Sequence, residues 1–300
     1  MKSTVNKGAV SRSQRFFVGA SLTPIMIAFL IFSIIPIVAS IAISFYNYSA
    51  LGNSPFSGIS NYIELFNDSV FHKVIINTLV FVVVAVIANL ILSTVMAVAV
   101  ESIANKGRRD FLRGLFFMPA VVPIVALSYV WIIMFEPNSG IINQSLGAIG
   151  AKVPIYWLTD AKLALPSVIV TTLWSDLGYN IVLIMAGLAS IPKMFYEAAH
   201  IDGANELQVF FKITLPLMAR TMLFVSMMTC ISYFQVFAQV QIMTGGGPDN
   251  ASQVLAYAIY QNAFQFMRMG YASAMAVVML VMILIVSVLQ LVSVKIDWEY

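Results

Sequence analysis

Six long runs of apolar residues, separated by polar segments, divide the chain. They extend over about residues 19–45, 75–100, 114–135, 165–191, 217–243 and 272–294. An α-helix rises about 1.5 Å per residue, so about 20 apolar residues are enough to cross the hydrocarbon core of a bilayer. The pattern therefore predicts an all-α, polytopic membrane protein with six transmembrane helices.

Composition agrees with a membrane location for the whole chain. Of the 300 residues, 60% are hydrophobic and 10% are charged, whereas about 25% of the residues of a soluble domain are charged. No internal repeat and no segment the size of a soluble domain interrupts the pattern. We therefore expect residues 1–18 to form an N-terminal arm and residues 19–300 to form one six-span domain.

The distribution of lysine and arginine predicts the orientation of the spans, because cytoplasmic loops retain positive charge. The N-terminal arm, the second loop, the fourth loop and the C-terminus hold most of these residues: Lys2, Lys7, Arg12, Arg15, Lys106, Arg108, Arg109, Arg113, Lys193, Lys212, Arg220 and Lys295. The opposite side holds only Lys73, Lys152, Lys162 and Arg268. Both termini are therefore predicted to be cytoplasmic.

The first apolar run has a competing interpretation as a signal peptide, because basic residues precede it. Its apolar stretch is longer than the usual core of about 7–15 residues, which favours an uncleaved anchor. Val38-Ala39-Ser40 would be a weak cleavage site. Cleavage there would remove one helix without reversing the others.

Residues 192–216 form a charged, glycine-broken insert between the fourth and fifth apolar runs. Pro192 suits the first turn of a helix, where a missing N–H group costs nothing, and a short helix is predicted over residues 193–201. Asp202 and Gly203 then break this helix. Glycine accepts backbone angles that other residues avoid, and an aspartate at this position can cap the next helix.

A second short helix is predicted over residues 204–213, and it is amphipathic. Positions spaced i, i+3, i+4 and i+7 form one apolar face, namely Leu207, Phe210, Phe211 and Thr214. Pro216 is expected to end the insert and admit the fifth span.

Periodicity and charge leave two interpretations of this insert open: a surface that docks a protein partner, or an amphipathic helix that lies on lipid headgroups. Helices of the second kind are usually rich in lysine and arginine on their polar face. Here acidic and basic side chains are mixed: Glu197, Asp202, Glu206, Lys193, Lys212 and His200. The mixture favours docking to a protein.

The insert also resembles a known motif. Glu197-Ala198-Ala199, three residues, Gly203, nine residues, Ile213, one residue and Leu215-Pro216 match the EAA loop of permeases from binding-protein-dependent ABC importers. The resemblance extends from about Trp174 to the sixth run, through Gly246-Gly247-Pro248. The likeness is to carbohydrate-uptake permeases of the maltose-transporter F-subunit type, without the extra N-terminal helices and large external insertion of that subunit.

The resemblance implies the type I, MetI-like permease fold in the plasma membrane of a bacterium. In that family the EAA loop forms coupling helices that sit in a groove of a cytoplasmic ATPase. Glu197 would supply the charged contact and Gly203 the turn, while the leucine and phenylalanine ridge would be buried. By resemblance, the docking residues are Glu197, Ala198, Ala199, Asp202, Gly203, Leu207, Phe210, Phe211, Ile213, Leu215 and Pro216.

The same resemblance implies the partners. They are a second homologous permease, a dimer of cytoplasmic ABC ATPases that binds ATP and Mg, an extracytoplasmic solute-binding protein, a sugar substrate and the lipid membrane. This chain is expected to bind no cofactor, since it contains no G-x-x-x-x-G-K-[ST] phosphate loop. A net charge of +3 is too small to indicate nucleic acid, and neither a metal site nor a catalytic site is expected.

Polar residues inside a bilayer are costly and usually face a cavity or a partner helix. The fourth run carries such a stripe on one helical face, formed by Thr172, Ser175, Asp176, Tyr179 and Asn180. Helix packing explains polar stripes as well as a solute pathway does. The family's sugar-contacting positions imply a substrate path formed by Thr172, Asp176, Tyr179, Thr229, Ser232 and Tyr233. Asp176 departs from the mostly neutral family pattern and favours either a cation-bearing sugar or a contact with the partner subunit.

Two other functions compete with this interpretation of a six-span protein. An ion-coupled secondary carrier usually shows internal repeats and broken helices, and Asp176 is the one obvious intramembrane acid here. An intramembrane enzyme would need a motif such as H-E-x-x-H or G-x-S-x-G, and neither occurs. The sequence therefore favours a permease subunit that is not itself an enzyme.

Overall fold

The computed structural model describes residues 12–48 and 54–293. In these ranges the regular elements are helices, apart from one isolated bridge between Tyr46 and Phe56. Most of the predicted N-terminal arm lies outside the described residues, as do Lys295 and the last residue of the predicted sixth span. The cytoplasmic location of both termini therefore stays a prediction.

Four stretches are long and apolar enough to cross a bilayer as single helices, and they coincide with the first, second, fourth and sixth apolar runs. The first stretch joins α1 (Arg12–Phe29), a π-helical turn (Leu30–Ile34) and α2 (Ile35–Ile43). The others are α4 (Ser69–Glu101), α8 (Ala164–Ala189) and α15 (Met269–Ser293).

The third run is not one straight helix. It forms α5 (Lys106–Val121) and α6 (Ile124–Met134), which meet at an angle of 95°. The cause is Pro123, which pushes the residue before it out of the helical region; Val122 accordingly has a ψ of 131°. Pro119 is accommodated inside α5.

The fifth run is also divided. Glu206–Leu217 and α12 (Ala219–Phe234) meet at 69°, and α12 ends well before the predicted boundary at residue 243. The chain then turns and forms a separate short helix, α13 (Ala238–Met243). The residues in the turn are themselves largely apolar, so hydropathy alone does not register this break. The part of the chain that the structure describes therefore has six spans if each bent pair crosses as one.

Short helices lie between the long ones along the chain: α3 (Ser60–Asn67), α7 (Ile141–Ala148), α9 (Lys193–Ile201) and α14 (Leu255–Tyr260), which continues as a π-helical turn (Gln261–Gln265). A tight turn links α6 to α7, where the carboxylate of Glu136 accepts hydrogen bonds from the backbone and hydroxyl of Ser139. These bonds to the charged form hold the pKa of Glu136 below its usual value.

Three clusters of buried apolar side chains hold the helices together. One lies around Phe81, Trp131 and Tyr233, and a second around Ile184 and Met218, on the side of the insert. The third, around Leu65, joins α3 and α4 to α14 and α15. Helix α8 packs against α4, α5 and α12, and it therefore belongs to the first two clusters.

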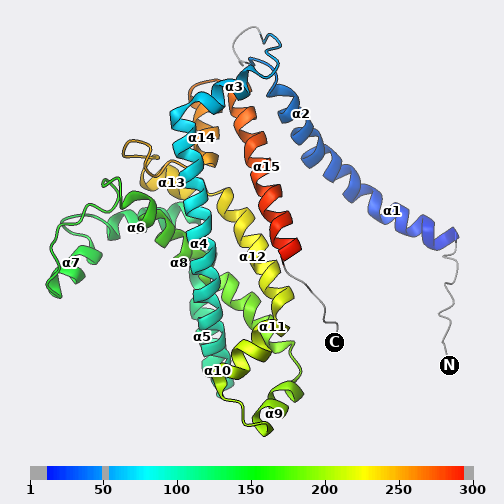
Figure 1. The fold of residues 1–300 in the computed structure, drawn as a ribbon, viewed down its shortest axis with the longest axis vertical. Helices are drawn as coiled ribbons and strands as arrows, with labels where there is room; N and C mark the ends of the chain where they lie inside the picture. The colour runs from blue at the N-terminus through cyan, green and yellow to red at the C-terminus, as the bar shows by residue number, and fades with distance from the viewer. Residues whose placement is uncertain (1–11, 49–53, 294–300) are drawn as a thin grey trace.

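Helix α1 stands apart from the bundle, as Figure 1 shows, whereas α2 contacts α15; none of residues 17–43 is buried. Their far end is fixed by Asn61 of α3, whose amide donates to the carbonyl oxygens of Ser44 and Tyr46 at 2.8 and 2.9 Å. Nearby, Gly270 at the start of α15 donates its N–H to the carbonyl of Tyr48. The exposed apolar face of α1 and α2 is consistent with a lipid or protein environment in a membrane.

The contact between α5 and α8 gives a test of the bundle. A Cβ atom added at Gly178 would lie 1.9 Å from the carbonyl oxygen of Phe116. Overpacking a core costs about 1–3 kcal/mol or more, so purified Gly178→Ala is expected to lose monodispersity at a lower temperature on heating in detergent. Gly114→Ala on α5 is the matched control, because nothing lies within 4 Å of a Cβ there. Equal thermal stability of the two variants would contradict the close contact.

Candidate functional site

The insert (residues 192–216) lies at one end of the bundle, where Figure 1 shows α9 beyond the tips of the long helices and α10 beside the end of α5. Helix α9 has the predicted bounds, and Pro192 precedes it as the N-cap residue. Gly203 has a φ of +76°, in the left-handed region that favours glycine. The predicted break at this position is therefore present in the backbone.

In the second half of the insert, the residue that caps the start of the helix is not the predicted one. Asp202 ends α9 and does not cap the next helix; Asn205 does. The amide oxygen of Asn205 accepts from the N–H of Gln208, and the amide oxygen of Gln208 accepts from the N–H of Asn205, both at 2.9 Å. This reciprocal capping box was not predicted, although both residue types suit it.

The predicted apolar face is also different. Helix α10 (Glu206–Val209) passes into a π-helical turn (Phe210–Thr214) and α11 (Leu215–Leu217), so Pro216 lies within helical structure and does not end it. The extra residue in a π turn rotates the later residues relative to the earlier ones. As a result Thr214 is buried, whereas Leu207 and Phe211 are 71% and 62% exposed.

The predicted docking residues fall into two sets by exposure. Ala199 is buried and Phe210, Ile213 and Leu215 are half-buried against the bundle. The remainder are exposed: Glu197, Ala198, Asp202, Gly203, Leu207, Phe211 and Pro216. We call this set the tip surface. Its large apolar side chains, Leu207 and Phe211, are not buried by any other residue in the part of the chain that the structure describes.

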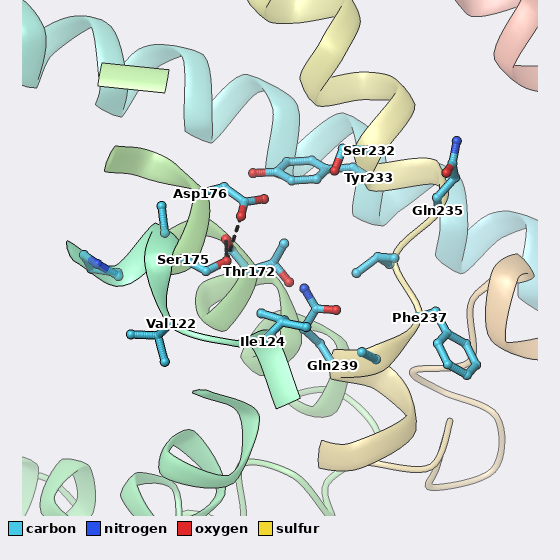
Figure 2. Close-up of a pocket in the computed structure, with 14 residues that line it drawn as sticks. Val122, Ile124, Thr172, Ser175, Asp176, Ser232, Tyr233, Gln235, Phe237 and Gln239 are labelled. Carbon is cyan, nitrogen blue, oxygen red and sulfur yellow. Dashed lines mark hydrogen bonds between the residues drawn. The ribbon is translucent and has the colours of Figure 1, made fainter. Parts of the chain in front are cut away.

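A polar cavity lies at a different place, between α8 and the junction of α12 with α13. Its volume is about 390 Å³, within the range of small-ligand sites. Figure 2 shows side chains from α8 and α12 and from the break between α5 and α6 directed toward it. Four of the six predicted path residues line this cavity: Thr172, Asp176, Ser232 and Tyr233.

The two other predicted path residues do not reach the cavity. Tyr179 is 51% exposed and lies one helical turn beyond Asp176, past the end of the cavity. Thr229 is buried one turn before Tyr233, where its hydroxyl oxygen accepts a hydrogen bond from Asn180. A position on the same helical face is therefore not sufficient for a residue to line the cavity, because the cavity extends along only part of each helix.

A buried hydrogen-bond network fixes one wall of the cavity. The amide of Asn180 donates to Asn89 Oδ1 at 2.6 Å and to Thr229 Oγ1 at 3.0 Å. The amide of Asn89 donates to the hydroxyl oxygen of Tyr233 at 2.9 Å. The ring of Tyr233 also meets Phe81 edge-on, with 5.9 Å between centroids. The network links α4, α8 and α12 and orients Tyr233.

Several residues that build the cavity are absent from the predicted path. The hydroxyl of Ser175 lies within hydrogen-bond distance of both the Thr172 carbonyl and Asp176 Oδ1, each at 2.8 Å. Gln239 comes from α13, which hydropathy assigns to the end of an apolar span, and Asn89 lies in the middle of the second run. A polar residue inside an apolar run is the signal available for both.

No group of three or more histidine, cysteine, aspartate or glutamate side chains within residues 12–48 and 54–293 is arranged to hold a metal ion. Asp176 forms no ion pair within these ranges. The cavity thus offers hydroxyl, amide and carboxyl groups together with aromatic and aliphatic carbon. Such a lining can bind a solute with several hydroxyl groups.

The network gives a second test. Asn180→Leu removes the donor to two buried oxygens, and the loss of membrane-protein hydrogen bonds costs about 0.6–2 kcal/mol. We expect a lower unfolding temperature in detergent. Tyr179→Phe is the control on the same helix, because that side chain is exposed. If both variants unfold at the wild-type temperature, the network does not hold α4, α8 and α12 together.

Comparison with protein families matches residues 93–295 to the binding-protein-dependent transport system inner membrane component. The probable ABC transporter permease protein YurN of Bacillus subtilis is 36% identical over 273 residues, which cover 90% of this chain and 93% of the relative. The lactose transport system permease protein LacF of Rhizobium radiobacter is 33% identical over 264 residues, which cover 87% and 88%.

A solved structure has the same fold. It is the crystal structure of a bacterial ABC transporter involved in the import of the acidic polysaccharide alginate, with a TM-score of 0.80 at 24% identity, covering 94% of this chain and 98% of the other. The predicted all-α membrane permease fold is therefore confirmed, and nothing in the comparisons favours the ion-coupled carrier. The chain belongs to the family of inner-membrane components of binding-protein-dependent transport systems.

Proposed function

We propose that the chain is one of two permease subunits of an ATP-driven importer that takes up a sugar or oligosaccharide. An extracytoplasmic binding protein delivers the solute, and a separate dimer of ABC ATPases binds ATP and Mg and hydrolyses the nucleotide. The family match over residues 93–295 is the observation that carries this proposal. The lactose permease relative supports the sugar class, and the neutral polar groups that dominate the cavity suit a hydroxyl-rich solute.

The tip surface is proposed as the docking site for the ATPase. Leu207 and Phe211 lie one helical turn apart and are both largely exposed, and burying such side chains is worth about 1.5–3 kcal/mol each. Acidic Glu197 is exposed as well and belongs to the same set of residues. A mixed acidic and apolar surface fits a protein groove better than anionic lipid, which attracts basic helices.

The inner side of the insert provides the mechanical connection. Phe195 and Tyr196 of α9 pack against the cluster that contains Ile184 of α8 and Met218 at the start of α12. Ile191, which joins α8 to α9, is buried in the same cluster. Packed interiors transmit displacement because they contain few voids. A movement of the docked ATPase would therefore shift α8 and α12, and both helices line the cavity.

Changes in the tip surface test this proposal. Phe211→Asp places a charge in the proposed groove, Glu197→Lys reverses the charged contact, and Gly203→Pro is incompatible with a φ of +76°. Each is expected to reduce uptake at least tenfold, and Phe211→Asp should also abolish copurification of the ATPase. Uptake is measured with a radiolabelled neutral disaccharide in cells that express the whole transporter.

Phe66→Asp is the control for Phe211→Asp, since Phe66 is 60% exposed on α3 at the other end of the bundle. It should leave copurification of the ATPase unchanged. Normal uptake and normal copurification in Phe211→Asp, with equal amounts of protein in the membrane, would show that the ATPase docks elsewhere.

A further inference from the structure

The residues that line the cavity include one acidic side chain and no basic side chain. Fourteen residues line the cavity, all within the described part of the chain, and Asp176 is the one Asp, Glu, Lys, Arg or His among them. No lysine, arginine or histidine from the described ranges lines this space. A solute that carries a carboxylate, phosphate or sulfonate would therefore find no cation among these lining residues to balance its charge.

Gln239 is the second unusual feature of the lining. Its side chain is only 9% exposed, yet its amide has no hydrogen-bond partner among residues 12–48 and 54–293. Figure 2 shows this amide directed into the cavity, toward Thr172 and Ile124. The polar atoms of this amide are not sealed off from the cavity, unlike those of the few fully buried groups without a partner in the described ranges. The amide is therefore free to form hydrogen bonds with a molecule in the cavity.

Asp176 faces the same space from α8. Its Oδ1 atom accepts from the Ser175 hydroxyl at 2.8 Å, and its Oδ2 atom has no partner in the described ranges. Tyr233 completes the set, because its hydroxyl oxygen already accepts from Asn89 and its own proton can be donated. The three side chains thus offer an acceptor, an amide that donates and accepts, and a donor. This combination matches neighbouring hydroxyl groups on a sugar ring.

We propose that Asp176 and Gln239 determine the specificity of the cavity for an uncharged or amino-bearing sugar and exclude acidic sugars. The inference rests on the proposed function. Asp176 accepts a hydroxyl or ammonium proton of the sugar, and Gln239 binds a second hydroxyl. An acidic group is excluded because burying a charge without a counter-charge is costly, and this holds for either protonation state of Asp176.

The fold alone does not impose this exclusion. The solved transporter of similar fold imports acidic alginate, so a difference in selectivity has to come from side chains. In this chain the candidates are Asp176, the one charged lining residue, and Gln239, whose amide points into the cavity.

The test uses the complete transporter, with both permeases and the ATPase, purified in nanodiscs without the binding protein. Saturation-transfer NMR measures binding of lactose, maltose, cellobiose and α-1,4-galactobiose at millimolar concentration. Digalacturonate is the acidic probe, because it differs from galactobiose only in bearing carboxylates at C6. We expect at least one neutral disaccharide to bind and digalacturonate not to bind.

The variants then assign the selectivity to the two residues. Gln239→Leu and Asp176→Asn should each weaken binding of the neutral disaccharide about tenfold or more, the usual effect of losing a buried hydrogen bond to a ligand. Gln239→Lys should gain binding of digalacturonate. Gln241→Leu, on the same helix but outside the lining, is the matched control and should bind as wild type does. Co-elution of all subunits on size exclusion verifies that each variant is assembled.

Three results would overturn the inference: equal binding of galactobiose and digalacturonate to the wild type, unchanged binding in assembled Gln239→Leu, or no gain of digalacturonate binding in assembled Gln239→Lys. A different result bears on the proposed function. If no sugar of either kind binds and the cognate binding protein carries a solute that is not a sugar, the proposed substrate class is wrong, together with the specificity built on it.

Discussion

The packing of α8 against α4, α5 and α12 is the interaction on which the rest of the molecule depends. Gly178 allows the α5 backbone to approach α8 closely, and Asn180 ties α8 to α4 and α12 through buried hydrogen bonds. Thr172 and Asp176 on the same helix face the cavity, while Ile184 belongs to the cluster beneath the insert. A helix held on three sides moves with its neighbours, so α8 can carry a displacement from one end of the bundle to the other.

The sequence predicted correctly those helices whose presence or bounds follow from nearby residues alone. Apolar length identified α4, α8 and α15, and the pairing of a proline start with a glycine stop gave the bounds of α9. The prediction failed at the break after Phe234, inside the fifth apolar run. The bend at Pro123 had a visible cause, but the turn after Phe234 is built from residues that also suit a helix. Hydropathy averages over a window and does not detect such a turn.

The residues that line the cavity could likewise be predicted only in part from the sequence. The helical stripe contains Thr172 and Asp176, which line the cavity, but it also contains Tyr179, which does not, because periodicity gives the angle around a helix and not the extent of a cavity along it. Thr229 illustrates the competing role of polar residues in membranes, where a hydroxyl often serves helix packing. Gln239 was missed because its importance comes from the absence of a neighbour within the described ranges, which only a structure can reveal.

The proposed substrate cavity and the proposed docking surface lie at separate positions that are connected by α8 and α12. The cavity depends on polar groups near the end of α12, whereas the tip surface depends on exposed apolar side chains at the far side of the cluster around Ile184. The network from Asn89 to Tyr233 lies between these regions. Since that network fixes a cavity wall to α4 and α8, a movement transmitted along α8 would change the position of Tyr233 relative to Asp176. The displacement that the docked ATPase imposes would thereby also release a bound solute, without any direct contact between the two sites.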